Sequence, residues 1–105
     1  MSDIALVYTT FPDADSAQAV AQRMIEDNFA ACANVMAGCV SIYRWEEGVA
    51  QDVETPVLFK TATDRAEALR DEIVQLHPYD LPVIEIWPAA VMRPVAEWVD
   101  ESVRD

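Results

Sequence analysis

The sequence has little of several features that common function classes need. Only two of the 105 residues are glycine, Gly38 and Gly48, which excludes a glycine-rich loop that cradles phosphate. Basic residues are also few: seven Lys and Arg stand against 19 Asp and Glu, a formal net charge of −12. Nucleic acids and anionic membranes require clustered positive charge, so we expect neither as a partner. An acidic surface concentrates cations, and it serves plain solubility equally well.

Cysteine and long apolar runs are scarce too. Two cysteines, Cys32 and Cys39, are too few for the disulfide framework of a small secreted domain. No stretch approaches the ~20 apolar residues of a membrane span, and the N-terminus does not resemble a signal peptide. We therefore expect a cytoplasmic protein with reduced thiols. Nucleophile-elbow and His-Glu-x-x-His motifs are missing, so we expect no enzyme activity.

The sequence does contain enough apolar residues for a packed core. Hydrophobic residues make up 52% of the chain, and its length suits one domain, placed at residues 1–105. Periodicity and turn residues predict strands at Ile4–Tyr8, Ala31–Trp45, Val53–Thr63 and Leu81–Trp87. A first helix is predicted from a cap at Asp13, Asp15 or Ser16 to near Asn28, and a second from Thr63 or Asp64 to Pro78. A third helix is predicted from about Pro94, with an apolar face of Val95, Trp98, Val99 and Val103. The order β-α-β-β-α-β with a C-terminal helix predicts an α+β, ferredoxin-like antiparallel sheet.

The two middle strands are longer than the outer two. Their arms of roughly 11–14 residues extend about 35–45 Å at ~3.3 Å per residue, about twice the length of the rest of the sheet. Gly38 indicates a bulge in the first arm, and Pro56 suits an edge or a bulge. The overhang carries Ile42, Tyr43 and Trp45, and an exposed apolar hairpin requires a partner. We therefore predict self-association into a cyclic oligomer.

Several short motifs together resemble the CutA divalent-cation tolerance family, over nearly the whole chain. They are Ala31–Val35 with Gly38, Ser41–Glu46, Lys60-Thr61, Leu76–Tyr79, and Pro82 with Glu85. The resemblance implies a homotrimer in which long hairpins reach across to neighbouring subunits. It implies a role in tolerance to copper and other divalent cations. Cu²⁺, another divalent cation or a small ligand is then expected at a subunit interface, without being required for folding.

The resemblance also implies an inter-subunit cleft. Its expected lining is Cys32, Tyr43, Trp45, Lys60, His77 and Glu85. From the residues alone, Lys60 and Glu85 each interrupt an apolar strand, where charges are uncommon unless paired or exposed. They are therefore expected to pair with each other, to line a cleft, or to face solvent near the strand ends.

His77 and Cys32 are the candidate metal ligands, because copper and zinc favour imidazole and thiolate groups. A single histidine cannot close a site within one chain, and His77 equally suits the C-terminal end of the second helix. Thr9 and Leu76 stand where some metal-binding relatives have Cys and His, so only the His77 position of that trio is kept.

The two cysteines admit a second role. Cys32 and Cys39 are seven residues apart, which places them on opposite faces of a regular strand, unless a bulge near Gly38 brings them to the same face. A buried apolar role is open to both.

The resemblance and the exposed hairpin together leave three candidate functions: a metal-tolerance trimer, a small-ligand-sensing signalling trimer, and a trimeric protein-binding platform.

Overall fold

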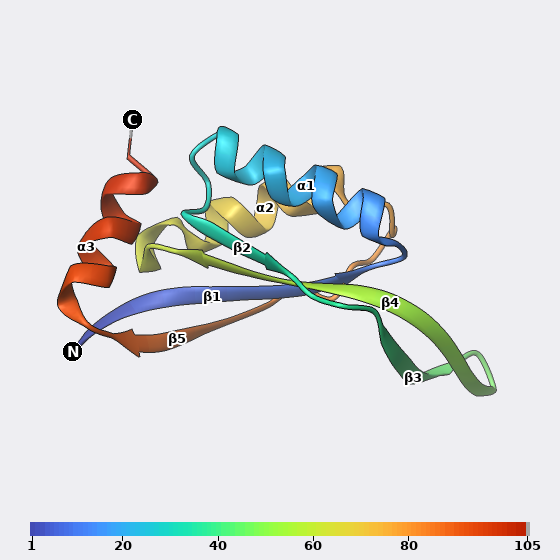
Figure 1. Ribbon diagram of the computed structural model, residues 1–105. Helices are drawn as coiled ribbons and strands as arrows, with labels where there is room; N and C mark the ends of the chain where they lie inside the picture. Colours follow the sequence, from blue (N-terminus) through green and yellow to red (C-terminus); the bar gives the residue numbers. More distant parts are fainter. Residues whose placement is uncertain (105) are drawn as a thin grey trace.

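A single antiparallel sheet forms the body of the molecule, and two helices cover one of its faces (Figure 1). The computed structural model describes residues 1–104. Its elements are β1 (Ser2–Phe11), α1 (Ala14–Glu26), β2 (Cys32–Val35), β3 (Cys39–Trp45), β4 (Gly48–Thr61), the 3₁₀ helix η1 (Thr63–Arg65), α2 (Ala66–Leu76), β5 (Glu85–Val91) and α3 (Arg93–Ser102). None of these helices is long and apolar enough to cross a membrane.

The strand order confirms the predicted topology. The sheet runs β2-β4-β1-β5, β3 also pairs with β4, and every pairing is antiparallel. This is the order that a β-α-β-β-α-β chain adopts when its two halves interleave in one ferredoxin-like sheet. Figure 1 shows α1 and α2 side by side above the sheet, with α3 at the end where the N-terminus lies.

The core lies between the sheet and the helices α1 and α2. Alternate residues of β1 and β4 point into it, among them Val7, Phe11 and Phe59, which are fully buried. Each such side chain stabilises the fold by about 1.5–3 kcal/mol relative to exposure. The intervening residues Leu6 and Tyr8 are only partly covered. The prediction that this strand is buried on both faces is therefore wrong for the single chain, because α1 and α2 cover one face.

The predicted element bounds need several corrections. The first strand is longer than Ile4–Tyr8, and the fourth runs from Glu85 to Val91 rather than over Leu81–Trp87. Pro88, directly after the predicted end of that strand, lies inside β5, opposite Ala5. β5 pairs only with β1, and such an edge strand tolerates proline because the missing N–H can face away from the ladder.

The helix ends were predicted with mixed success. Asp13 caps α1 as predicted, since its side chain accepts a hydrogen bond of 2.7 Å from the backbone N–H of Ser16. Neither Thr63 nor Asp64 caps α2, because η1 precedes that helix and no side-chain cap bond forms. The last helix begins at Arg93, close to Pro94 as predicted. Its predicted apolar face is only half buried, because Val99 and Val103 are covered while Val95 and Trp98 are exposed.

The hairpin extends beyond the rest of the sheet, as predicted. β1 pairs with β4 from Thr55 onward, so Gly48–Glu54 pairs only with Cys39–Trp45. We call these two segments, with the turn between them, the overhang (residues 39–54). It lengthens the molecule to 46 Å, against 25 and 22 Å in the other directions. On the face that continues from the core, Val40, Ile42, Val49 and Val53 are between 57% and 71% exposed.

A bulge separates β2 from β3. The three residues Met36–Gly38 stand opposite two residues of β4, between the pairs Val35↔Val57 and Cys39↔Glu54. The N–H of Met36 donates to the carbonyl of Pro56 at 2.9 Å, so the proline sits at the bulge as predicted. The extra residue places Cys32 and Cys39 on the same face of the sheet. Both are free thiols.

Candidate functional site

Three of the predicted cleft residues lie on the face of the sheet opposite α1 and α2, which we call the open face. Cys32 is directly opposite Lys60, and Lys60 is opposite Leu6 in β1. Tyr8, two residues along β1 on the same face, is opposite Glu85. Cys32, Lys60 and Glu85 therefore share one surface across four strands, although they come from distant parts of the chain.

Lys60 and Glu85 have no ionic partner among the residues that the structure describes. None of the ion pairs among residues 1–104 involves Lys60 or Glu85, so the expected pairing between them does not occur. The ring of Tyr8 lies 6.4 Å from that of Trp87. Burial, with nearby negative groups including Glu85, raises the pKa of Tyr8. This part of the face combines aromatic rings with isolated charges of both signs.

His77 lies on the other side of β1. Only 8% of it is exposed, and its ring stacks on Phe11 with centroids 4.4 Å apart. Its Nδ1 accepts a hydrogen bond of 3.1 Å from the backbone N–H of Tyr79, and its Nε2 donates to the carbonyl of Thr10 at 2.9 Å. Because a backbone N–H can only donate, Nδ1 is unprotonated and Nε2 carries the proton. Burial lowers the pKa of His77, although the Thr10 carbonyl opposes this, and the ring is neutral.

His77 terminates α2, which was the structural role predicted for it. It is the C-cap residue, and its backbone N–H bonds to the carbonyl of Ile73. The expected benefit of a positive imidazolium at the helix end does not apply to a neutral ring. The Oγ1 of Thr9 lies 3.4 Å from Nε2 and donates to the carbonyl of Val83 at 2.8 Å. Both ring nitrogens of His77 are therefore already engaged.

Tyr43 and Trp45 lie on the overhang, away from the body. Their rings meet edge to face at 6.3 Å, and the Tyr43 hydroxyl donates to Asp52 on the neighbouring strand. By register they lie on the same side of the ribbon as Glu54 and the open face. Within one chain, the six predicted cleft residues thus occupy three places: the open face, the overhang, and the space behind β1.

The root of the overhang holds a cluster that the sequence did not reveal. Oε2 of Glu54 accepts hydrogen bonds from the hydroxyl of Tyr79 at 2.5 Å and of Thr10 at 3.2 Å. Burial alone raises the pKa of Glu54, but these bonds and one from Ser41 outweigh it and hold the pKa below its ordinary value. Burial and the hydrogen bond to Glu54 raise the pKa of Tyr79. A signal was present, since Glu54, like Lys60 and Glu85, is a charge within a strand of apolar and β-branched residues.

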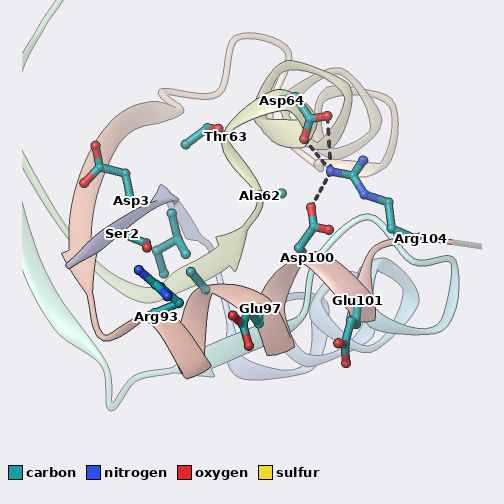
Figure 2. A pocket seen from close by; sticks show the side chains of 12 residues that line it. Ser2, Asp3, Ala62, Thr63, Asp64, Arg93, Glu97, Asp100, Glu101 and Arg104 are labelled. Carbon is teal, nitrogen blue, oxygen red and sulfur yellow. Dashed lines mark hydrogen bonds and ion pairs between the residues drawn. The ribbon is translucent and has the colours of Figure 1, made fainter.

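A concavity lies at the other end of the molecule, between α3, η1 and the start of β1. Its volume is about 480 Å³, and Arg93 and Arg104 line it together with Asp3, Asp64, Glu97, Asp100 and Glu101. Figure 2 shows Arg104 reaching between Asp64 and Asp100, at 2.9 and 2.5 Å. The pair with Asp64 joins the end of α3 to η1, while the pair with Asp100 is local to that end of the helix. Sequence reasoning had no signal for this concavity, because its charges come from three distant segments.

The donors of one chain do not fit a closed metal site. Among residues 1–104, no three His, Cys, Asp or Glu side chains are grouped so that they could hold an ion. Cys32 and His77 lie on opposite sides of the sheet, so they cannot bind the same ion within one chain. Copper and zinc sites need several such ligands together.

Comparison with known proteins places the chain in one family. The family model described as "CutA1 divalent ion tolerance protein" matches residues 5–102. The divalent-cation tolerance protein CutA of Thermus thermophilus is 35% identical over 103 residues, which are 97% of this chain and 98% of the relative. That of Pyrococcus horikoshii is 36% identical over 100 residues, 94% and 97% of the two chains.

Solved structures agree in fold over the same length. CutA from Xylella fastidiosa superposes with a TM-score of 0.93 at 30% identity, covering 98% of this chain and 100% of that one. CutA1 from Ehrlichia chaffeensis gives 0.92 at 30% identity, covering 99% and 98%. CutA from Archaeoglobus fulgidus, described as a periplasmic divalent cation tolerance protein, gives 0.91 at 28% identity, covering 98% and 100%.

Proposed function

The chain belongs to the CutA1 divalent ion tolerance family, and from this we propose that it serves divalent-cation tolerance as a homotrimer. We propose a binding role rather than a catalytic one, and a cytoplasmic location, which the two free thiols suit.

The overhang carries the proposal of a trimer. Its β-branched side chains are largely exposed in the single chain, although they continue the face that is buried under α1 and α2. A two-stranded hairpin is marginal in water without a surface to cover its apolar side. A second copy offers the same apolar surface, and repeated copies close into a ring. Light scattering at micromolar concentration is expected to give three times the chain mass of 11.7 kDa, and a monomer or dimer mass would contradict the trimer.

We propose further that Cu²⁺ contacts the trimer through Cys32 rather than His77. The Cys32 thiol is partly exposed on the open face, and its one hydrogen bond, to Asn34, is weak at 3.8 Å. His77 would have to break two hydrogen bonds and leave its stack on Phe11 before it could bind. One thiol per chain does not close a site, but a trimer supplies three.

Titration with Cu²⁺ tests this assignment. Calorimetry on the wild type is expected to show binding at micromolar metal that is lost in Cys32→Ala and kept in Cys39→Ala, the matched control on the same face. His77→Gln preserves hydrogen-bonding groups and is expected to bind like the wild type. Equal binding in the wild type and Cys32→Ala would contradict the role of Cys32.

The open face also favours a second candidate, the sensing of a small anionic ligand. Within residues 1–104 Lys60 has no ionic partner, and it is flanked on β1 by Leu6, with Tyr8 beyond it. An isolated cation among apolar groups is typical of a site for a small organic anion. A ligand from this class that raises the melting temperature of the wild type but not of Lys60→Ala would support this candidate over direct metal binding.

A further inference from the structure

A closed ring of hydrogen bonds joins the root of the overhang to the loop after α2. Glu54 accepts from the hydroxyls of Tyr79, at 2.5 Å, and Thr10, at 3.2 Å. The backbone N–H of Tyr79 donates to His77, and His77 donates to the carbonyl of Thr10. The ring therefore links four residues from three separate segments: β1, β4 and the loop that begins at His77.

Glu54 lies at the boundary between the body of the sheet and the overhang. Thr55 is the last β4 residue that pairs with β1, and the next residue, Glu54, pairs only with β3. The bulge at Met36–Gly38 interrupts the neighbouring strand at the same level. Strands bend at bulges, so the direction of the overhang relative to the body is set there, while β4 runs unbroken past the same level.

Apart from the continuous strand β4, few contacts fix the overhang to the body of the chain. Within residues 1–104, the side-chain hydrogen bonds between the overhang and the rest of the protein all end on Glu54. The Tyr43–Asp52 and Cys39–Ser41 contacts are internal to the overhang. Hydrogen bonds from hydroxyls to an ionised carboxylate are among the stronger ones in proteins.

We propose that Glu54 and Tyr79 form a latch that couples the α2–β5 loop to the direction of the overhang. When the latch is closed, the loop, β1 and the hairpin root move as one body. When Tyr79 leaves Glu54, the loop no longer constrains the direction of the overhang at the bulge. The coupling is reciprocal, so a change in the hairpin also reaches the loop. For its biological consequence the latch rests on the proposed trimer, because the overhang is the part expected to reach a neighbouring subunit.

Hydrogen exchange with Tyr79→Phe tests the latch. This variant loses one oxygen, and amide exchange across residues 39–54 is expected to rise about tenfold while exchange in α1 stays unchanged. Tyr43→Phe is the matched control, because it removes a similar hydroxyl–carboxylate bond that lies wholly within the overhang. Thr10→Val removes the longer bond to Glu54 and is expected to give a smaller rise. Wild-type exchange across residues 39–54 in Tyr79→Phe, or an equal rise in Tyr43→Phe, overturns the proposal.

Coupling in the reverse direction provides a second test. Glu54→Gln is expected to speed exchange of the Tyr79 amide proton, which bonds to His77 rather than to Glu54. In a Glu54→Ala background, which has no side-chain acceptor for the Tyr79 hydroxyl, Tyr79→Phe is expected to add little. Fully additive effects of the two substitutions would show that they act separately and would overturn the latch. Light scattering on the same samples separates the two proposals: a monomeric wild type contradicts the trimer, and unchanged exchange contradicts the latch.

Discussion

Glu54 shows how partners decide what one side chain contributes. Partial burial of a carboxylate favours its neutral form, but hydroxyl donors favour its charged form. At Glu54 the donors Tyr79, Thr10 and Ser41 prevail, and the pKa falls below its ordinary value. A group whose pKa is lowered by folding stabilises the fold above its unfolded pKa, and that contribution is lost as the pH falls through the folded value.

The pH dependence of stability is therefore expected to change in Glu54→Gln. At pH 7 this variant should be less stable than the wild type by about 1 kcal/mol, because a neutral amide oxygen holds the hydroxyl donors less strongly than an ionised carboxylate does. The gap should shrink between pH 7 and pH 3, because the protonated fraction of the wild-type carboxyl grows as the pH falls toward its lowered pKa. Urea unfolding at both pH values measures this difference in the free energy of unfolding. Glu47→Gln in the exposed turn is the control. A gap that is equally large at pH 3 would contradict the assignment.

At the candidate site, the sequence revealed which residues were unusual but not what they contact. Alternation along strands, with a bulge near Gly38, allowed Cys32 and Cys39 to share a face, and the register places them on one. It could not show that His77 contacts Thr10, 67 residues away, because that contact depends on how α2 packs on β1. Glu54 was missed for the same reason, since its two partners outside the overhang come from β1 and the α2–β5 loop.

At the scale of the element, the hairpin turn holds a residue in an unfavourable conformation. Glu46 has φ 54°, in the left-handed region, where a side chain such as Glu costs about 1 kcal/mol. Asn tolerates this region better, as at Asn28, which follows α1 with φ 62°. Two residues, Glu46 and Glu47, connect the strands, so the turn is short and the strain cannot be spread.

Glu46→Asn is accordingly expected to stabilise the protein by about 0.5–1 kcal/mol. The gain should appear in the free energy of unfolding measured with urea. The same substitution at Glu47, which does not have a positive φ, is the control and should bring no such gain. An equal gain at both positions would show that removal of acidic charge, and not relief of backbone strain, was responsible.

Element types were easier to predict than their ends. The apolar periods predicted the three α-helices and the strands, with β2 and β3 as one interrupted strand and without η1. Gly38 and Pro56 correctly marked the bulge. The end of the last strand was harder to predict, because a proline such as Pro88 is compatible with two positions. It can end a strand, or it can lie within an edge strand. Only the pairing of β5 with β1 alone decides between them, and that is a property of the whole sheet.

At the scale of the whole molecule, the overhang is an apolar surface on a strongly acidic chain. The net charge of −12 opposes association, so contact between copies requires apolar burial that outweighs the repulsion. The exposed face of Val40, Ile42, Val49 and Val53 supplies such a surface. The overhang argues for a partner, but the number three comes from the family resemblance, because no property of one chain sets the rotation between copies.

A charge placed in this surface tests the assembly. Ile42→Asp would bury a carboxylate without a partner at every interface of the ring, a cost of several kcal/mol at each. We expect the mass to fall from three chains to one at micromolar concentration, while the far-ultraviolet circular dichroism stays that of a folded chain, because Ile42 lies outside the core. Gln18→Asp adds the same charge on the exposed side of α1 and should leave the mass unchanged. If Ile42→Asp also keeps the mass of three chains, the β-branched face of the overhang is not the surface that holds the subunits together.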